Sequence, residues 1–246
     1  MMRTVGVDLA ASDAATAVAV IDWSDGAAEL SSLRLGASDA DIVEAARSAG
    51  KTGIDCALGW PDAFTAFVAA HADPDTVPDV DGGADWRRRL VYRETDRVVR
   101  EVTGRWPLSV STDRLGVTAL RCAGLVARLR AAGADVDRSG AGDIAEVYPG
   151  ASLRVWGFET RGYRVDADAR RVLLGALRRK APWLDLGDAG ELMVRSGDAF
   201  DAVVAALATR AAARGAVLEP APQQHAIARR EGWVALPTGP IGDLVG

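Results

Sequence analysis

The run Thr4-Val5-Gly6-Val7-Asp8-Leu9-Ala10 has the apolar composition of a strand, with a single aspartate inside it. A second run, Gly53-Ile54-Asp55-Cys56-Ala57-Leu58, repeats this arrangement further along the chain. An acid inside an apolar strand is unfavourable unless it is paired, hydrogen-bonded or bound to a metal. If the two runs form neighbouring strands of one sheet, their carboxylates project from the same side. We therefore predict that Asp8 and Asp55 belong to one site.

The surrounding sequence predicts a mixed α/β sheet. Residues 16–23 and 30–35 are also strand-like, and short turns connect them to the first run, which is typical of an antiparallel three-strand meander. A helical pattern over 39–49 then leads into the Asp55 run, and such a crossover favours a buried, partly parallel strand. The alternation resumes later, with helices predicted at 115–132, 166–180 and 198–213 and a short strand at 144–148.

The length of 246 residues suits one sizeable core plus an insertion, so we expect a single domain over 1–246. Residues 60–113 interrupt the α/β alternation. They contain a Pro/Asp/Gly loop at 74–83 and an Arg-rich helical segment at 86–103. We interpret 60–113 as a helical insertion or lid within the domain.

Charge and cysteine content exclude several classes of protein. A net charge of −5 argues against a protein that coats nucleic acid with many Lys and Arg, although it is compatible with a local basic groove. Cys56 and Cys122 are too few for a disulfide framework or a four-thiolate zinc site, and both lie in apolar runs typical of buried free thiols. Neither a signal peptide nor a membrane span is visible. We expect a cytoplasmic protein with no membrane partner.

Three further acids accompany the strand aspartates. Glu146 interrupts a third strand-like run, and Asp198 and Asp201 lie three residues apart at the start of a predicted helix, where both can face one direction. Oxygen ligands suit Mg²⁺ or Mn²⁺, and no His/Cys cluster competes for zinc. Each acid alone fits a turn or cap. The combination favours a shared site, because the order of strand acid, meander, helix, strand acid and helix acid recurs in one known architecture.

Six ordered blocks of this sequence resemble the signature blocks of domain-of-unknown-function family 429, which is described as predicted nucleases of RNase H-like fold. The blocks are Gly6-Val7-Asp8-Leu9-Ala10, Ile54-Asp55-Cys56-Ala57-Leu58-Gly59-Trp60-Pro61, Tyr92-Arg93-Glu94-Thr95-Asp96-Arg97, Glu146-Val147-Tyr148-Pro149-Gly150, Asp198-Ala199-Phe200-Asp201-Ala202 and Glu231-Gly232-Trp233. The resemblance spans nearly the whole chain. It implies an RNase H-like mixed sheet of an antiparallel meander plus parallel strands, flanked by helices.

The resemblance also implies a chemistry. The Asp-x-x-Asp-Ala start of the last long helix resembles that of Holliday-junction resolvases, which implies Asp8, Asp55 and Asp201 as core metal ligands with Asp198 beside them. The second position is Asp here, where the resolvases carry Glu, so the metal geometry can differ. Asp8 would bridge two Mg²⁺ or Mn²⁺ ions during phosphodiester hydrolysis, and Asp55 and Asp201 would each complete one. Whether Glu146 binds metal or holds the site together is open at this point.

The Arg-rich segment is the candidate surface for nucleic acid. Arg93 and Arg97 follow the leading arginines at helical spacing, and guanidinium groups match phosphate oxygens in bidentate fashion. The alternative is a solvated helix in which Glu94 and Asp96 pair with these arginines. We select Arg93, with Arg97, as the predicted substrate contacts.

Two other functions remain open. A catalytically idle member of the fold would act as a binding protein, although such a member is expected to lack some of the acids. An ATP-dependent phosphotransferase also begins with a strand aspartate, but Leu9-Ala10-Ala11-Ser12 offers no glycine for a phosphate turn. The type of nucleic acid, the mode of cleavage and the pathway are not encoded in any pattern we recognise. By analogy with resolvases, a homodimer is a further expectation.

Overall fold

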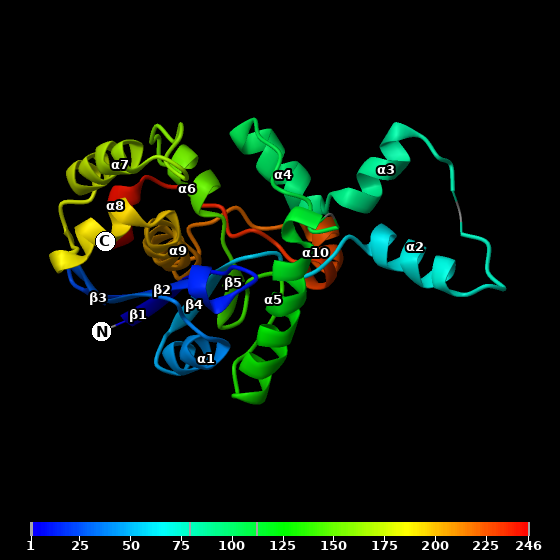
Figure 1. Cartoon of the computed structure of the whole chain (residues 1–246), viewed down its shortest axis with the longest axis horizontal. Helices are drawn as coiled ribbons and strands as arrows, with labels where there is room; N and C mark the ends of the chain where they lie inside the picture. The colour runs from blue at the N-terminus through cyan, green and yellow to red at the C-terminus, as the bar shows by residue number, and fades with distance from the viewer. Residues whose placement is uncertain (1, 79, 112, 246) are drawn as a thin grey trace.

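The computed structural model describes residues 2–78, 80–111 and 113–245. Its centre is a six-stranded mixed sheet with the order β5-β4-β1-β2-β3-β6 (Figure 1). The strands β1 (Met2–Asp8), β2 (Ala17–Ser24) and β3 (Ala27–Leu35) form the predicted antiparallel meander. The strands β4 (Lys51–Asp55) and β5 (Ile144–Glu146) continue it on the other side of β1 in parallel orientation. The short β6 (Leu184–Asp185) pairs with β3. The mixed α/β class is therefore confirmed.

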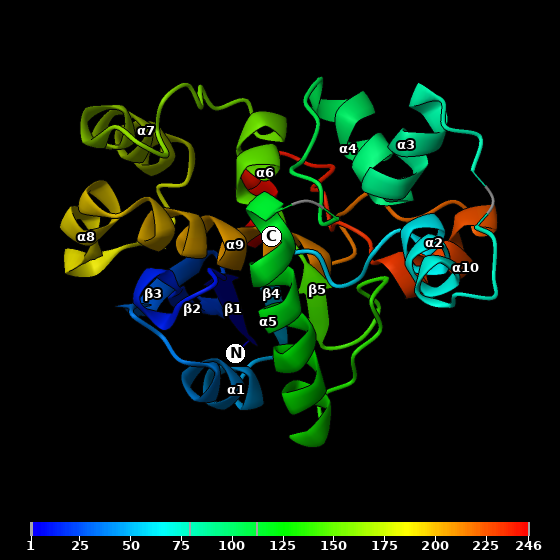
Figure 2. The same cartoon turned by 45° about the vertical axis from the view of Figure 1, so that its right-hand side comes forward.

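Helices cover both faces of this sheet (Figure 2). On one face, α1 (Asp39–Arg47) and α5 (Asp113–Ala131) pack against a layer of apolar strand residues that includes Val5, Val7 and Ile54. On the opposite face, α9 (Gly197–Ala213) packs against β1, β2 and β4. Twelve residues of α9 are buried, which makes it the central helix of the core.

Two glycines bring α9 unusually close to the sheet. A Cβ on Gly6 would stand 2.1 Å from the backbone nitrogen of Ala206, and a Cβ on Gly53 would stand 2.0 Å from the Thr209 hydroxyl. Gly6 and Gly53 are register partners in β1 and β4, so together they form a bare patch on which α9 rests. Any larger side chain at either position would push the helix away.

The remaining helices surround these three layers. On the α9 side lie α6 (Pro149–Val155), α7 (Ala167–Lys180) and α8 (Gly190–Arg195), and α10 (His225–Glu231) lies near α2 and α4. Short 3₁₀ turns occupy Asp13–Ala15, Gly187–Ala189, Pro222–Gln224 and Ile241–Val245. The C-terminal segment is extended near Val234, which bridges to Glu146 in parallel orientation. Within the described residues, no helix has the length and apolar character required to span a membrane.

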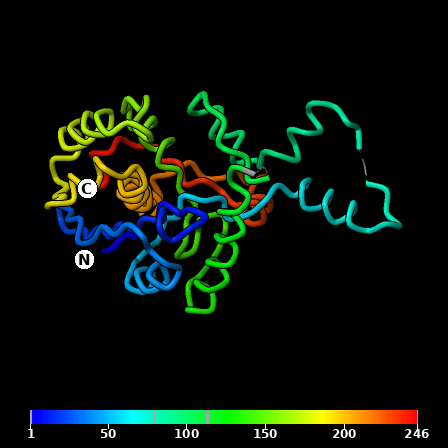
Figure 3. The backbone as a smooth tube through the Cα atoms, in the orientation of Figure 1, coloured from blue at the N-terminus to red at the C-terminus, as the bar shows by residue number. Residues whose placement is uncertain are grey.

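The predicted insertion contains α2 (Asp62–Ala72), α3 (Ala84–Val91) and α4 (Glu94–Thr103), while positions 79 and 112 within it lie outside the described residues. Neither α2 nor α3 has a buried residue, and the two extend together away from the sheet (Figure 3). The prediction of one continuous Arg-rich helix is wrong. The helical segment is interrupted at Arg93, whose backbone is extended at φ −73° and ψ 167°. The Asp96 carboxylate accepts the Arg93 backbone N–H at 2.9 Å, and this hydrogen bond starts a new helix.

Candidate functional site

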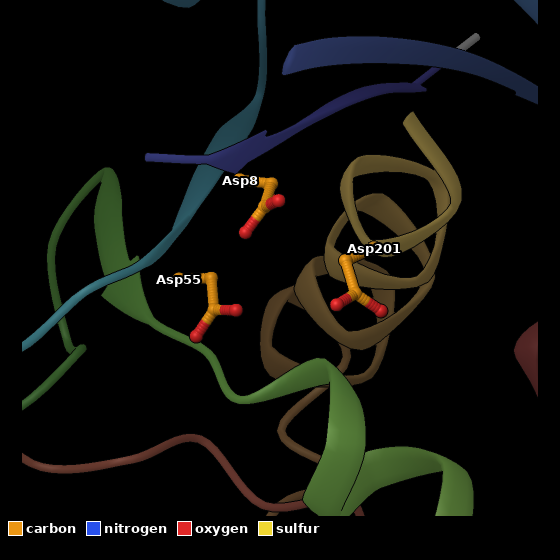
Figure 4. A group of neighbouring side chains, drawn as sticks. All are labelled: Asp8, Asp55 and Asp201. Atoms are coloured by element: carbon orange, nitrogen blue, oxygen red, sulfur yellow. The ribbon is translucent and has the colours of Figure 1, made fainter. Parts of the chain in front are cut away.

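The carboxylates of Asp8, Asp55 and Asp201 meet at one end of the sheet (Figure 4). Asp8 ends β1, Asp55 ends β4, and the two are direct register partners across the parallel pair. One ligand oxygen from each residue lies within 4.8 Å of the others. We call these three residues the acidic cluster. The sequence prediction that the strand acids and the helix acid converge is thus matched by the geometry.

The close approach of α9 explains how Asp201 reaches the strand acids. Gly6 and Asp8 lie two residues apart on β1, as do Gly53 and Asp55 on β4, so each glycine shares a sheet face with its aspartate. The helix that rests on the glycines therefore presents Asp201 directly to the aspartates. The Ser196 hydroxyl accepts the Ala199 backbone N–H at 3.1 Å and fixes where α9 begins.

Asp198, the fourth predicted ligand, lies at the edge of this arrangement. It is half-buried in the first turn of α9 and does not join the group of three carboxylates. It is nevertheless close enough for its charge to raise the pKa values of Asp8 and Asp201. The structure thus places Asp198 beside the acidic cluster rather than in it.

Burial and mutual repulsion disfavour the charged forms of the acidic cluster. Burial raises the pKa of Asp8 well above its ordinary value, and the charges of Asp55 and Asp201 raise it further. Burial raises the pKa of Asp55 to about 7, with Arg164 opposing this shift. The pKa of Asp201 is also raised by burial, again against the influence of Arg164. Three close carboxylates of this kind favour the binding of a cation.

Two residues of the segment between α6 and α7 contact the acidic cluster. The Arg164 guanidinium donates to Asp201 at 2.6 Å and lies 3.5 Å from an oxygen of Asp55, while 53% of its side chain is exposed. The Tyr163 hydroxyl donates to the other Asp201 oxygen at 2.9 Å. Burial and the Asp201 charge raise the pKa of Tyr163, so the hydroxyl keeps its proton. Both oxygens of Asp201 are therefore held in a fixed orientation.

A cavity of about 470 Å³ lies beside the acidic cluster. Asp8 and Asp55 form part of its wall, and four arginines, Arg93, Arg114, Arg154 and Arg164, form another part. Apolar side chains, including Leu108 and Leu115, also line it. The combination of acids, guanidinium groups and apolar surface in one concave space is typical of a ligand site.

Glu146 belongs to a separate group of ion pairs. Its oxygens accept from the two terminal nitrogens of Arg93 at 2.6 and 2.7 Å, and one of them also accepts the Leu58 backbone N–H at 3.0 Å. Arg93 binds Asp96 as well, at 2.9 Å. We call Arg93, Asp96 and Glu146 the Arg93 network. Because its carboxylate is already bound, Glu146 holds the end of β5 in place rather than joining the acidic cluster.

The Arg93 network argues against the predicted contact between Arg93 and phosphate. Only 4% of the Arg93 side chain is exposed, and its guanidinium is committed to two carboxylates. Burial alone would lower the pKa of Arg93, but Glu146 and Asp96 raise it well above its ordinary value. Arg97, the second predicted contact, pairs with Glu94 at 2.8 Å and is absent from the described residues that line the cavity. Arg93 thus reaches the cavity wall with its guanidinium already paired, and Arg97 does not line the cavity.

Glu231 and Gly232 complete the support of this region. The Glu231 carboxylate accepts the backbone N–H of Asp62 and that of Glu94, both at 2.8 Å, so one side chain caps the first turns of α2 and α4. Gly232 has a φ of +93°, and a Cβ there would stand 2.7 Å from the Glu146 carboxylate. Glycine is required for this close approach.

Sequence reasoning missed Tyr163, Arg164 and Arg154 because they lie in or next to an irregular segment with no periodic pattern. A usable signal did exist for the approach of α9. The spacing Gly-x-Asp occurs in both Gly6-Val7-Asp8 and Gly53-Ile54-Asp55, which marks two neighbouring positions without side chains on the face that carries the acids.

Residues 6–225 match a family model described as "Protein of unknown function (DUF429)". The chain belongs to this family. The matched range holds five of the six sequence blocks, and the block that begins at Glu231 follows its end. No match was found among curated proteins or among solved structures. The description of the family gives no activity, so the functional argument depends on the geometry of the site.

Proposed function

We propose that this protein is a divalent-metal-dependent nuclease with an RNase H-like fold. The observation that carries the proposal is the convergence of Asp8, Asp55 and Asp201 to within 4.8 Å beside a cavity that also contains arginines. Carboxylates bind hard cations, and guanidinium groups bind phosphates. The two kinds of group in one cavity suit a phosphodiester substrate.

The topology supports the RNase H-like assignment. An antiparallel meander, β1 to β3, is extended by the parallel strands β4 and β5, and the acids lie on β1, on β4 and on the helix that packs across them. This is the order of elements that the sequence resemblance implies. The parallel arrangement is essential, because it brings the carboxyl ends of β1 and β4 to the same edge of the sheet.

The residues of the acidic cluster fit Mg²⁺ or Mn²⁺. They supply oxygen donors only. Burial first, and then the charges of the neighbouring carboxylates, raise the pKa values of Asp8 and Asp55, and a bound divalent ion would stabilise their charged forms. Ions held there would activate a water molecule and stabilise the departing oxygen of the phosphodiester. Tyr163 and Arg164 orient Asp201, and Asp198 adds negative charge nearby.

The experiment is a cleavage assay on labelled single-stranded, duplex and branched DNA and RNA in Mg²⁺ or Mn²⁺. We expect Asp8→Asn and Asp201→Asn each to reduce cleavage by about 1,000-fold or more, since each removes a charge that helps to hold the ions. Asp168→Asn is the matched control, because this exposed aspartate lies on α7 and pairs only with Arg171 among the contacts found for the described residues. Undiminished cleavage by Asp8→Asn would refute the proposal.

One observation favours the alternative of a catalytically idle binding protein. Arg164 already supplies a cation to Asp201 and approaches Asp55, and an arginine can take the place of a metal ion in such a cluster. Calorimetry with Mn²⁺ separates the two functions. Binding by the wild type that is lost in Asp8→Asn supports the nuclease. Absence of binding together with absence of cleavage supports the binding protein.

A further inference from the structure

Arg154 has an unsatisfied guanidinium group beside the acidic cluster. It lies on α6 and lines the 470 Å³ cavity, and its Nη1 atom is buried without a hydrogen-bond partner. No ion pair to its side chain is found among the described residues, whereas Arg93 and Arg164 on the same cavity each bind two carboxylates. A buried N–H without an acceptor is unfavourable, so this atom requires an ordered water or a ligand as its partner.

Gly150 locates this group relative to the acidic cluster. A Cβ on Gly150 would stand 3.5 Å from the Tyr163 hydroxyl and 4.0 Å from Arg154 Nη1. The same Tyr163 hydroxyl donates to Asp201. Arg154 Nη1 and the Tyr163 hydroxyl that binds Asp201 therefore both lie near Gly150, on the wall of the same cavity.

We propose that Arg154 binds the phosphate group of a nucleotide-sized phosphate ester in this cavity. An anionic oxygen there supplies the acceptor that Arg154 lacks, in a charge-assisted hydrogen bond. The volume of about 470 Å³ lies within the range of pockets that hold one small ligand. The apolar side chains of Leu108 and Leu115 offer contact to the rest of the ligand. The assignment of the ligand to a nucleic-acid strand rests on the proposed function, but the phosphate contact does not.

The acids on the same cavity make this binding depend on a divalent cation. Without a cation, Asp8 and Asp55 offer a phosphate no positive charge, and their ionised forms repel it. An ion on the acidic cluster would place positive charge on the same cavity as Arg154 and attract the phosphate. We expect nucleoside 5′-monophosphate to bind more tightly with Mg²⁺ than in chelator.

The experiment measures binding by calorimetry of adenosine 5′-monophosphate, adenosine and inorganic phosphate in Mg²⁺, with wild type and Arg154→Gln. We expect Arg154→Gln to weaken the binding of the monophosphate by about tenfold or more and to leave the binding of adenosine unchanged. Arg171→Gln, at an exposed arginine of α7, is the control and should change neither. Inorganic phosphate distinguishes recognition of the phosphate group alone from recognition of the whole ester.

A second variant tests the same space without removing a charge. Gly150→Ala adds a methyl group whose nearest neighbours lie at ordinary contact distances of 3.5 Å or more, so the protein should fold normally. The methyl group would stand close to both Arg154 Nη1 and the Tyr163 hydroxyl on the cavity wall, and it should weaken binding of the monophosphate several-fold. Gly124→Ala, a helical glycine of α5 with open space around it, is the control.

The results separate this inference from the proposed function. Loss of monophosphate binding in Arg154→Gln, with no cleavage of any nucleic acid by wild type, supports the phosphate contact and refutes the nuclease. Equal affinity of wild type and Arg154→Gln overturns the phosphate contact, whether or not nucleic acid is cleaved. Failure of the wild type to bind any of the three probes in Mg²⁺ also overturns it.

Discussion

The acidic cluster and the Arg93 network are neighbours that differ in whether their carboxylates have hydrogen-bond partners. In the Arg93 network, every carboxylate oxygen of Asp96 and Glu146 accepts from Arg93 or from a backbone N–H, and the side chains are at most 4% exposed. In the acidic cluster, three carboxylates depend on the partly exposed Arg164 and the Tyr163 hydroxyl, and their pKa values are raised. Satisfied carboxylates stabilise the fold, whereas unsatisfied ones beside a cavity can bind a ligand.

The largest expected effect on stability comes from breaking the Arg93 network. Glu146→Gln leaves Arg93 buried with one charged partner fewer, and breaking a buried ion pair in this way costs about 3–5 kcal/mol of the free energy of unfolding. Urea denaturation measures the change. The exposed Glu191→Gln on α8 is the control, with an expected change within about 0.5 kcal/mol. A change of that small size in Glu146→Gln would show that the network does not stabilise the fold.

A carboxylate-to-amide substitution in the acidic cluster should change the free energy of unfolding in the opposite direction. Asp8→Asn removes a source of repulsion, so the metal-free variant should be at least as stable as the wild type. Saturating Mg²⁺, at about 100 times its Kd, should stabilise the wild type by about 2.7 kcal/mol and raise its Tm by about 5–10 °C. This gain should disappear in Asp8→Asn and persist in Asp168→Asn. If metal-free Asp8→Asn is less stable than the wild type, the acidic cluster stabilises the fold as the Arg93 network does, and the contrast between the two groups is wrong.

The two regions should also differ in how stability depends on pH. Folded-state pKa values above the ordinary 3.8, including about 7 for Asp55, mean that the folded protein keeps protons that the unfolded chain has lost. The stability of the metal-free protein is therefore greatest at low pH within this window and declines as the pH rises from about 4 through about 7. Thermal unfolding across this range checks the sign.

Mg²⁺ should reverse this trend, because it binds the deprotonated carboxylates. The gain in Tm on addition of Mg²⁺ should be larger at pH 8 than at pH 5.5, and Asp8→Asn should show no gain at either pH. An equal gain at both values would mean that the ion binds away from the acidic cluster. The Arg93 guanidinium does not titrate in this window, because Glu146 and Asp96 raise its pKa well above its ordinary value.

The elements that sequence predicted well are those with strong local periodicity. The meander, the crossover through α1, the strand at Glu146 and the helix that carries Asp201 all occur close to their expected positions. The continuous helix through Arg93 was wrong, since the Asp96 side chain captures the Arg93 backbone N–H and ends the helical pattern. The short β6, α6, α8 and α10 had no distinctive pattern and were not predicted.

The sequence alone determined which residues are chemically unusual. An aspartate in each of two apolar strands is detectable in one dimension, because burial of an acid is unfavourable in any fold. The Asp-x-x-Asp spacing on a helix is equally local. These patterns selected five acids, Asp8, Asp55, Glu146, Asp198 and Asp201, and the class of metal that carboxylate oxygens favour. The resemblance to resolvases narrowed the core to Asp8, Asp55 and Asp201, the three that the structure brings together.

Only the tertiary structure decided the partners of each charge. Glu146 and Asp55 look alike in sequence, since each is an acid in an apolar run, but Glu146 meets Arg93 across 53 residues of chain and Asp55 meets other acids. Arg93 and Arg154 likewise carry the same guanidinium group, although the first is bound to two carboxylates and the second lacks a partner for Nη1. The energy of a charge depends on neighbours within a few ångströms, and those neighbours come from distant parts of the chain.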